Sequence, residues 1–185
     1  NRSLVANFLD IEPPVIHGCP TNITAGNDPG VCGAKVSWVE PTATDNTGVT
    51  SFTSNHKPGD TFPVGMNTVT YTARDAAGNT ATCSFKVKVK DREKPVISDV
   101  SVSPSSLWPP NKKMVGITLA VTANDDTDAH PVCKITGVTC NEAFTAADWQ
   151  ITGDLTVNLR ADRAGNGSGR VYTIQVACRD RWGNV

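Results

Sequence analysis

The chain has 185 residues, of which 38% are hydrophobic and 19% are charged. This composition can build packed cores and is too weakly charged for a disordered chain. Its 17 basic and 18 acidic residues leave a net charge of −1, without the basic excess typical of proteins that bind nucleic acids or anionic membranes, and no apolar run reaches the length of a membrane-spanning helix.

Short stretches in which Val, Ile, Thr and aromatic residues alternate with polar ones run through the chain, between clusters of Gly, Pro, Asn and Asp. A period of two buries one face of a strand and leaves the other in water. The expected strands, in chain order, lie around 16 and 23 and at 36–38, 49–52, 69–73, 83–89, 97–102, 115–121, 132–138, 155–159 and 171–178. The pattern predicts an all-β protein of the sandwich type.

Three segments of the first half recur in the second half, which predicts two domains of one type. They are 14–16 with 95–97, 42–46 with 122–126, and 74–79 with 179–184. We therefore expect an N-terminal strand at 1–11, a first domain at 12–90, a linker at 91–94 and a second domain at 95–185.

The repeat also predicts which strand the second domain lacks. After the turn at 75–79 the first domain continues into a strand at 83–89, whereas the equivalent turn at 180–184 is followed by Val185 alone. With an offset of 81 residues, which places Asp10 on Asp91, the N-terminal residues Leu4, Ala6 and Phe8 fall on the inward positions of that strand. We expect the N-terminal segment of a neighbouring unit to supply the missing strand. The competing interpretation is that 185 residues are one period of a longer tandem repeat.

The first domain resembles the hyalin repeat (HYR) family. The matching segments span residues 12–90 in the family's order: Pro13-Pro14-Val15-Ile16 with Cys19-Pro20, Pro41 to Asn46, Thr61 to Gly65, and Val69 to Asp75 running on to Cys83-Ser84-Phe85. The second domain looks more loosely like the immunoglobulin-like module that can follow hyalin repeats in bacterial secreted proteins, on residues 107–111, 149–155 and 169–174. The resemblance implies two tandem immunoglobulin-like β-sandwiches of an extracellular adhesion or matrix protein, without catalysis of their own.

Six cysteines, three in each half, show no CxxC pair and no histidine at ligand spacing. Disulfide bonds are the favoured interpretation, which indicates an oxidising, extracellular compartment, secreted or at the cell surface. Three tripeptides beginning at Asn1, Asn22 and Asn166 fit the N-x-S/T pattern of glycosylation, although a chain rich in Asn and Thr produces such matches by chance.

The family resemblance implies a disulfide bond between Cys19 and Cys83. Many bacterial relatives carry a cysteine after Asp-Asn, where this chain has Thr47. Cys32 therefore lacks its expected local partner, and the second domain also has an odd number. We expect Cys133 and Cys178 in disulfide bonds, and Cys32 and Cys140 are further candidates; the connectivity stays open. The two cysteines left over could bridge the domains, bridge neighbouring subunits, or remain free thiols.

No catalytic motif is present, and the three histidines fit surface positions better than a triad, so we expect a protein without enzymatic activity. Calcium is the ligand that the acidic residues favour, because it takes oxygen ligands. The candidates lie in an acidic loop and at the linker: Asp125, Asp126, Asp128, Asp91 and Glu93. The alternative is that these side chains only stabilise turns.

A strand supplied by the next unit leads to head-to-tail assembly, because such a contact does not close on itself. We therefore predict a structural subunit of an extracellular fibre or matrix, assembled from copies of itself, with glycans as a further class of partner. Two alternatives remain open: one period of a covalent tandem-repeat surface adhesin, and a non-catalytic adhesive or sugar-binding accessory region of a secreted enzyme.

Overall fold

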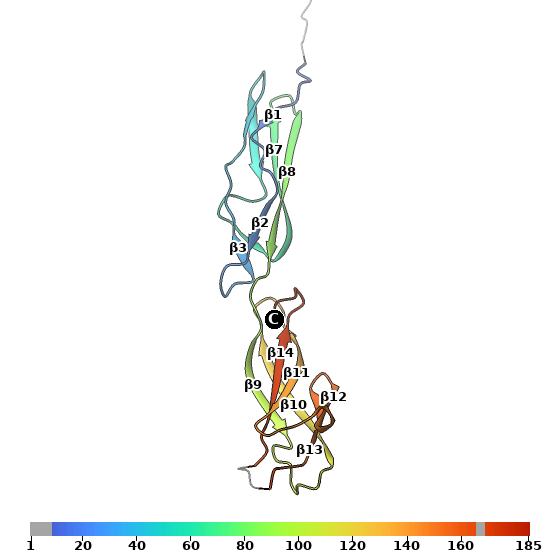
Figure 1. Ribbon diagram of the computed structural model, residues 1–185. Coiled ribbons are helices and arrows are strands. Elements are labelled where there is room, and N and C mark those ends of the chain that lie inside the picture. Colours follow the sequence, from blue (N-terminus) through green and yellow to red (C-terminus); the bar gives the residue numbers. More distant parts are fainter. Residues whose placement is uncertain (1–8, 166–168) are drawn as a thin grey trace, which may run out of the picture. The chain divides into compact units, whose positions relative to one another are not determined.

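The computed structural model of the protein describes residues 9–165 and 169–185. The chain folds into two compact units, Asn1–Arg92 and Glu93–Val185 (Figure 1). Apart from one turn of 3-10 helix at Ala146–Asp148, every regular element in the described residues is a strand. The prediction of an all-β protein is therefore confirmed.

Within the described residues, the first unit contains eight strands. They are β1 (Val15–His17), β2 (Ile23–Gly26), β3 (Gly33–Lys35), β4 (Thr42–Thr44), β5 (Val49–Ser54), β6 (Thr61–Pro63), β7 (Gly65–Asp75) and β8 (Thr80–Lys90). One sheet has the order β2-β8-β7-β5, in which β2 runs parallel to β8, and the pairs β1-β4 and β3-β6 complete the unit.

The core of the first unit lies between the β3-β6 pair and the four-stranded sheet. Every second residue of β8 from Cys83 to Val89 is buried, as the period of two predicts. These side chains meet Phe62 of β6, which has no exposed surface, and the ring of Trp38 lies edge-on to Phe85 with 5.2 Å between centroids. The two facing layers make the unit a β-sandwich.

One predicted strand of this unit lies at a different place. The structure has β3 at Gly33–Lys35 instead of a strand at 36–38, because these three residues are the ones that pair with β6. Val36 still exchanges backbone hydrogen bonds, since its N–H donates to Asp60 O and its carbonyl accepts from Gly59 N. The buried position of Val36 is what the alternation had indicated.

The second unit, outside the undescribed residues 166–168, contains six strands. They are β9 (Val96–Ser103), β10 (Met114–Asn124), β11 (Val132–Cys140), β12 (Trp149–Gly153), β13 (Thr156–Arg160) and β14 (Tyr172–Arg179). One sheet has the order β12-β13-β10-β9 and the other is the antiparallel pair β11-β14. Its core joins Ile117 and Leu119 of β10 and Val157 of β13 to Ile135 of β11, so this unit is also a sandwich.

The turns that follow β7 and β14 have the same construction, as their matching sequences predict. Asp75 is buried, and its carboxylate accepts hydrogen bonds from the backbone of Gly78 and Asn79. Asp180 is also buried and accepts from backbone N–H groups of its own turn. In both turns a buried carboxylate accepts hydrogen bonds from the backbone N–H groups of its own turn. Asp75 and Asp180 are therefore equivalent residues, and the two units can be aligned on them.

Candidate functional site

The clearest difference between the two units is the number of neighbours that equivalent strands have. In the first unit β7 lies between β5 and β8, whereas in the described part of the second unit β14 pairs with β11 alone. Aligning Asp75 with Asp180 places β14 on β7, with an offset of 105 residues. One edge of β14 therefore presents N–H and C=O groups where β7 is bonded to β8.

The side chains of β14 show the same difference. Val69 and Tyr71 on β7 are 0% and 3% exposed, whereas their counterparts Ile174 and Val176 are only half-buried. The inward alternation is the same in both strands, so the difference comes from what covers them. In the first unit β8 provides that cover, and in the second unit the equivalent space is open.

A groove of about 510 Å³ lies along this open side of the second sandwich. Its floor contains Ile117 and Leu119 of β10, and its two sides are formed by β14 and by the C-terminal half of β9. On the β9 side, Val100 and Val102 are 50% and 41% exposed. Apolar side chains of both sheets thus line this groove.

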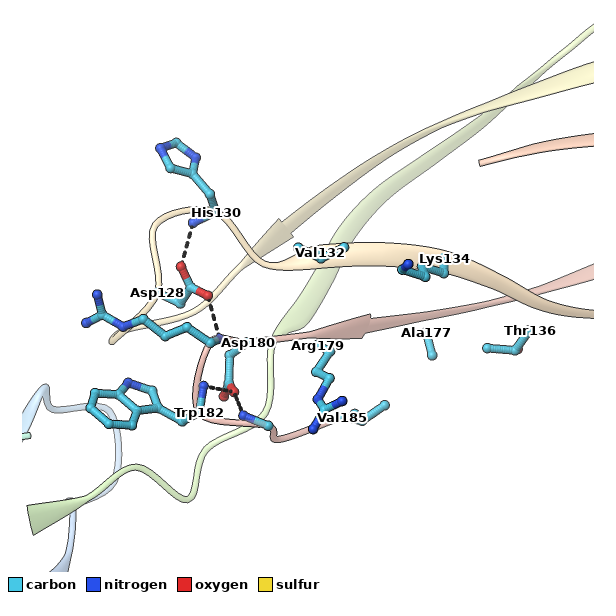
Figure 2. A pocket seen from close by; sticks show the side chains of 12 residues that line it. Asp128, His130, Val132, Lys134, Thr136, Ala177, Arg179, Asp180, Trp182 and Val185 are labelled. Carbon is cyan, nitrogen blue, oxygen red and sulfur yellow. Dashed lines mark hydrogen bonds between the residues drawn. The ribbon is translucent and has the colours of Figure 1, made fainter. Parts of the chain in front are cut away.

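A second hollow, of about 710 Å³, lies on the outer face of β11 and β14 (Figure 2). Figure 2 shows Val132 and Lys134 along one side and the turn with Asp180 and Trp182 along the other. Asp128 joins the two sides, since its carboxylate accepts hydrogen bonds from the backbone of His130 and of Arg181. These hydrogen bonds connect the loop that contains Asp128 to the turn that contains Arg181, so Asp128 has a structural role beside this hollow.

Three carboxylates of the first unit gather at one end of the sandwich. One oxygen each of Asp10, Asp45 and Asp75 lies within 4.8 Å of the others. Asp10 is held there because it accepts the Thr47 hydroxyl at 2.6 Å, and because Asn79 Nδ2 donates to its carbonyl at 3.2 Å. Oxygen ligands that meet at one point suit a hard cation such as Ca²⁺.

Hydrogen bonds hold the pKa of the Asp10 carboxyl below its ordinary value, with the Thr47 hydroxyl as the largest cause and the Glu12 N–H next. For Asp180, burial is the largest influence and acts to raise the pKa. Hydrogen bonds from the side chain and backbone of Asn184, and from the backbone of Gly183 and Trp182, together lower the pKa below its ordinary value. Both groups are therefore held in the charged form that a cation needs.

The second unit repeats part of this arrangement. Carboxylate oxygens of Asp125 and Asp180, the equivalents of Asp45 and Asp75, also lie within 4.8 Å of each other. Asp125 Oδ1 accepts from the backbone of Thr127 and of Asp128, whereas its Oδ2 is buried and has no hydrogen-bond partner in the described part of the chain. A buried anionic oxygen without a partner is costly, and a bound cation would satisfy it.

The acidic residues predicted as calcium ligands thus have different roles. Asp125 belongs to a carboxylate cluster, Asp128 bonds to the turns, and Asp126 is an exposed neighbour. Asp91 and Glu93 lie at the end of the first unit and at the start of the second.

The prediction missed Asp10, Asp75 and Asp180 as members of the clusters, whereas Asp45 was expected as the counterpart of the acidic loop in the first domain. A signal was present in the repeat, because Asp45, Asp75 and Asp180 all belong to segments that recur between the two halves.

The cysteines form one disulfide bond in each unit. Cys19 is joined to Cys83, the pair that the family resemblance implied, and Cys133 is joined to Cys178 directly across β11 and β14. Cys32 and Cys140 are in neither bond; Cys32 is exposed and Cys140 is half-buried.

Of the predicted modification sites, Asn22 is exposed, and its Oδ1 accepts from Lys86 N. Asn1 and Asn166, like the predicted assembly residues Leu4, Ala6 and Phe8, lie outside the described residues.

The geometry defines a two-unit β-sandwich protein in which the second sandwich has an open side. Residues 9–89 match the HYR domain family, so the first unit contains a HYR domain. The chain is 46% identical over 93 residues to hyalin of Lytechinus variegatus, covering 49% of this chain and 18% of that protein. It is 43% identical over 99 residues to the "Sushi, von Willebrand factor type A, EGF and pentraxin domain-containing protein 1" of Rattus norvegicus, covering 52% of this chain and 3% of that protein.

The chain therefore spans less than a fifth of the length of these relatives. Among solved structures, the chain is similar to extracellular cadherin domains 3–6 of protocadherin gamma B2, with 18% identity and a TM-score of 0.43, over 89% of this chain and 46% of that chain. In the described residues no helix has the length and apolar character needed to cross a membrane.

Proposed function

We propose that this chain is a non-catalytic structural module of an extracellular fibre or matrix, and that its second unit is completed by a strand from a neighbouring copy. Membership of residues 9–89 in the HYR domain family, shared with hyalin, supports an adhesion-related role. The two disulfide bonds fit an oxidising, extracellular compartment. The second unit is, in this proposal, the immunoglobulin-like module that follows hyalin repeats in bacterial secreted proteins.

The observation that carries the proposal is the open edge of β14. A β-sandwich that lacks one strand exposes backbone groups and core side chains together, and an added strand satisfies both. In the first unit the same slot is filled by β8, which makes ten backbone register pairs with β7. This difference supports the second sandwich as the acceptor of one extended strand.

Residues 4–8 are the proposed donor. Their inward residues Leu4, Ala6 and Phe8 correspond to Phe85, Val87 and Val89 of β8 when Asp10 is aligned with Asp91. The donor is followed within two residues by Asp10, which the carboxylate cluster anchors to its own unit. The donor strand of one copy would bind in the groove of a neighbouring copy, and the short segment that ends at Asp10 would connect it to its own first unit. Head-to-tail contacts of this kind extend into a filament.

The covalent tandem repeat is the main competitor, because the strand after the turn at 180–184 could belong to the same polypeptide. An adhesive or sugar-binding accessory region is the other. Donor-strand assembly, the covalent tandem repeat and the accessory region differ in the size of the covalent chain and in whether the isolated chain assembles.

Removal of residues 1–9 from the full chain is the decisive test. We expect the 185-residue chain to form polymers that sediment rapidly and fall to a species of 19.6 kDa in denaturing electrophoresis. The shortened chain should stay monomeric, because it lacks the donor strand while keeping the acceptor groove. A chain that remains a monodisperse monomer with residues 1–9 present would contradict donor-strand assembly, and a much larger denatured chain in the native material would favour the covalent repeat.

We also propose that the carboxylate clusters bind calcium. The unpartnered, buried Oδ2 of Asp125 supports this in the second unit, and the three converging carboxylates support it in the first. No lysine or arginine forms an ion pair with Asp10, Asp45 or Asp75 in the described residues, so no basic side chain offsets the repulsion among the three carboxylates. A bound Ca²⁺ would remove that repulsion and fix the three segments to one another.

Calcium should therefore raise the melting temperature of the chain, since a ligand that binds only the folded state at about 100 times its Kd adds about 2.7 kcal/mol. The rise should be much smaller with Mg²⁺, which demands a stricter geometry. Asp45→Asn keeps the oxygen that accepts from the turn backbone but removes a charge, and it should reduce the rise. Glu40→Gln, at an exposed carboxylate outside the cluster, is the matched control. Equal rises in both variants would refute this site.

A further inference from the structure

We propose that Tyr172 sets the register of the incoming strand by accepting only a small side chain opposite it, and that Ala6 is that side chain. This inference rests on the proposed function, since it concerns the same groove. It identifies the pair of residues that decides how a second copy of this chain docks.

The pairing follows from the two alignments of the repeat. Tyr172 of β14 corresponds to Asn67 of β7, because Asp180 corresponds to Asp75. In the first unit Asn67 lies directly opposite Val87 of β8. Val87 corresponds in turn to Ala6, so a strand that docks as β8 does would place Ala6 opposite Tyr172.

The sizes of these residues change in opposite directions. The first unit combines the shorter Asn67 with the branched Val87, whereas the second would combine the large Tyr172 with the small Ala6. Directly opposed side chains on one face of a sheet have Cβ atoms about 5 Å apart, so their volumes must be complementary. On the donor strand, the larger inward residues Leu4 and Phe8 lie on either side of Ala6, and Leu4 would lie opposite Ile174.

Tyr172 cannot easily make room for a larger partner. Its hydroxyl donates to the carbonyl of Arg160 at 2.9 Å and accepts from Arg170 Nη1 at 3.3 Å. Arg170 is itself held by Glu142, with 3.2 Å between Nε and Oε2, and both of these side chains are nearly buried. The ring is therefore anchored at its polar end, and rotation out of the groove would break these bonds.

This arrangement discriminates between registers. A slip of one residue would turn the apolar face of the donor to solvent and bring Asn7 or Val5 inward. A slip of two residues keeps the face but places Leu4 or Phe8 opposite Tyr172, where the space suits a methyl group. Only the register with Ala6 at this position combines the right face with the right size.

The test compares two substitutions in the full chain, Ala6→Phe and Val5→Phe. In the proposed register Ala6→Phe overfills the groove and should weaken assembly about tenfold or more, as overpacking of a well-filled core does. Val5→Phe points away from the groove and should change assembly by less than about twofold, because an outward side chain in a docked strand meets solvent. Assembly is followed by sedimentation of the polymer over a series of concentrations.

A second substitution makes the test specific to Tyr172. Tyr172→Ala should restore assembly in the chain that also carries Ala6→Phe, because it opens the space that the new ring needs. Circular dichroism and non-reducing electrophoresis of the unassembled Tyr172→Ala chain establish that the fold and both disulfide bonds are retained. If Tyr172→Ala loses the fold, Tyr172→Leu serves the same purpose, since it shortens the side chain and keeps it apolar.

The outcomes separate this inference from the proposed function. If removal of residues 1–9 abolishes assembly but Ala6→Phe is harmless, the strand docks and the register proposal is wrong. If Val5→Phe blocks assembly and Ala6→Phe does not, the register is shifted by one residue and the proposal is again wrong. If removal of residues 1–9 leaves assembly unchanged, donor-strand assembly itself fails.

Discussion

Replacement of both Cys19 and Cys83 by serine should lower the free energy of unfolding of the first unit by about 4 kcal/mol. The bond closes a segment with a sequence separation of 64 residues, and a long loop loses much chain entropy in the unfolded state when it is closed. It joins the segment before β2 to the middle of β8, so the same change loosens the strand that covers β7. Denaturant unfolding under non-reducing conditions measures the difference.

Cys32→Ser is the matched control, because Cys32 is exposed and forms no disulfide bond with another described cysteine. That variant should unfold within about 0.5 kcal/mol of the unchanged chain, as surface substitutions generally do. A Cys19/Cys83 variant as stable as the control would show that the bond contributes little to the native state.

Phe85→Ala should cost the first unit about 3 to 5 kcal/mol, because the side chain is 3% exposed and truncation leaves a cavity beside Trp38. Leu4→Ala, at the equivalent donor position, should leave the unfolding free energy of the unassembled chain unchanged and weaken assembly instead. The two substitutions address the same slot, filled within one chain in the first unit and between chains in the second. Thermal or denaturant unfolding of the monomer, together with sedimentation of the polymer, measures both effects.

A loss of monomer stability in Leu4→Ala comparable to that in Phe85→Ala would contradict the proposal, since residues 4–8 would then be packed in their own chain. An assembly constant unaffected by Leu4→Ala would contradict it in the other direction. Together, the two substitutions therefore test whether residues 4–8 pack in their own chain or in a neighbouring chain.

Much of the fold was predictable because it follows from local patterns. The alternation in β8 and β10 sets which residues face inward, and both strands appear where that alternation places them. The recurring Asp-to-Asn turns at 75–79 and 180–184 are also local, because a single carboxylate satisfies the backbone of its own turn. The boundaries of β3 were less predictable, since they depend on pairing with β6, which lies beyond β4 and β5 in the chain.

The candidate site was predictable only in part. The repeat indicated which strand the second domain lacks, and it located the proposed donor at Leu4, Ala6 and Phe8. The carboxylate cluster of the first unit was not predicted as a whole, because Asp10, Asp45 and Asp75 come from three distant segments and meet only when the sandwich closes. Asp128 was included among the calcium ligands because it lies near Asp125 in the sequence, whereas its carboxylate accepts from Arg181 on another turn.

The amino-acid sequence by itself determined the all-β class, the two repeated units, the inward face of each strand and the residues of the proposed donor. These properties depend on spacing along the chain. Only the tertiary structure decided that Ile174 and Val176 stay half-buried, that Ile174 lines a groove, and that the hydroxyl of Tyr172 donates a hydrogen bond to Arg160. The alternation along a strand determines which face of the sheet a side chain lies on. Which residues cover that side chain depends on the order of the strands in the sheets.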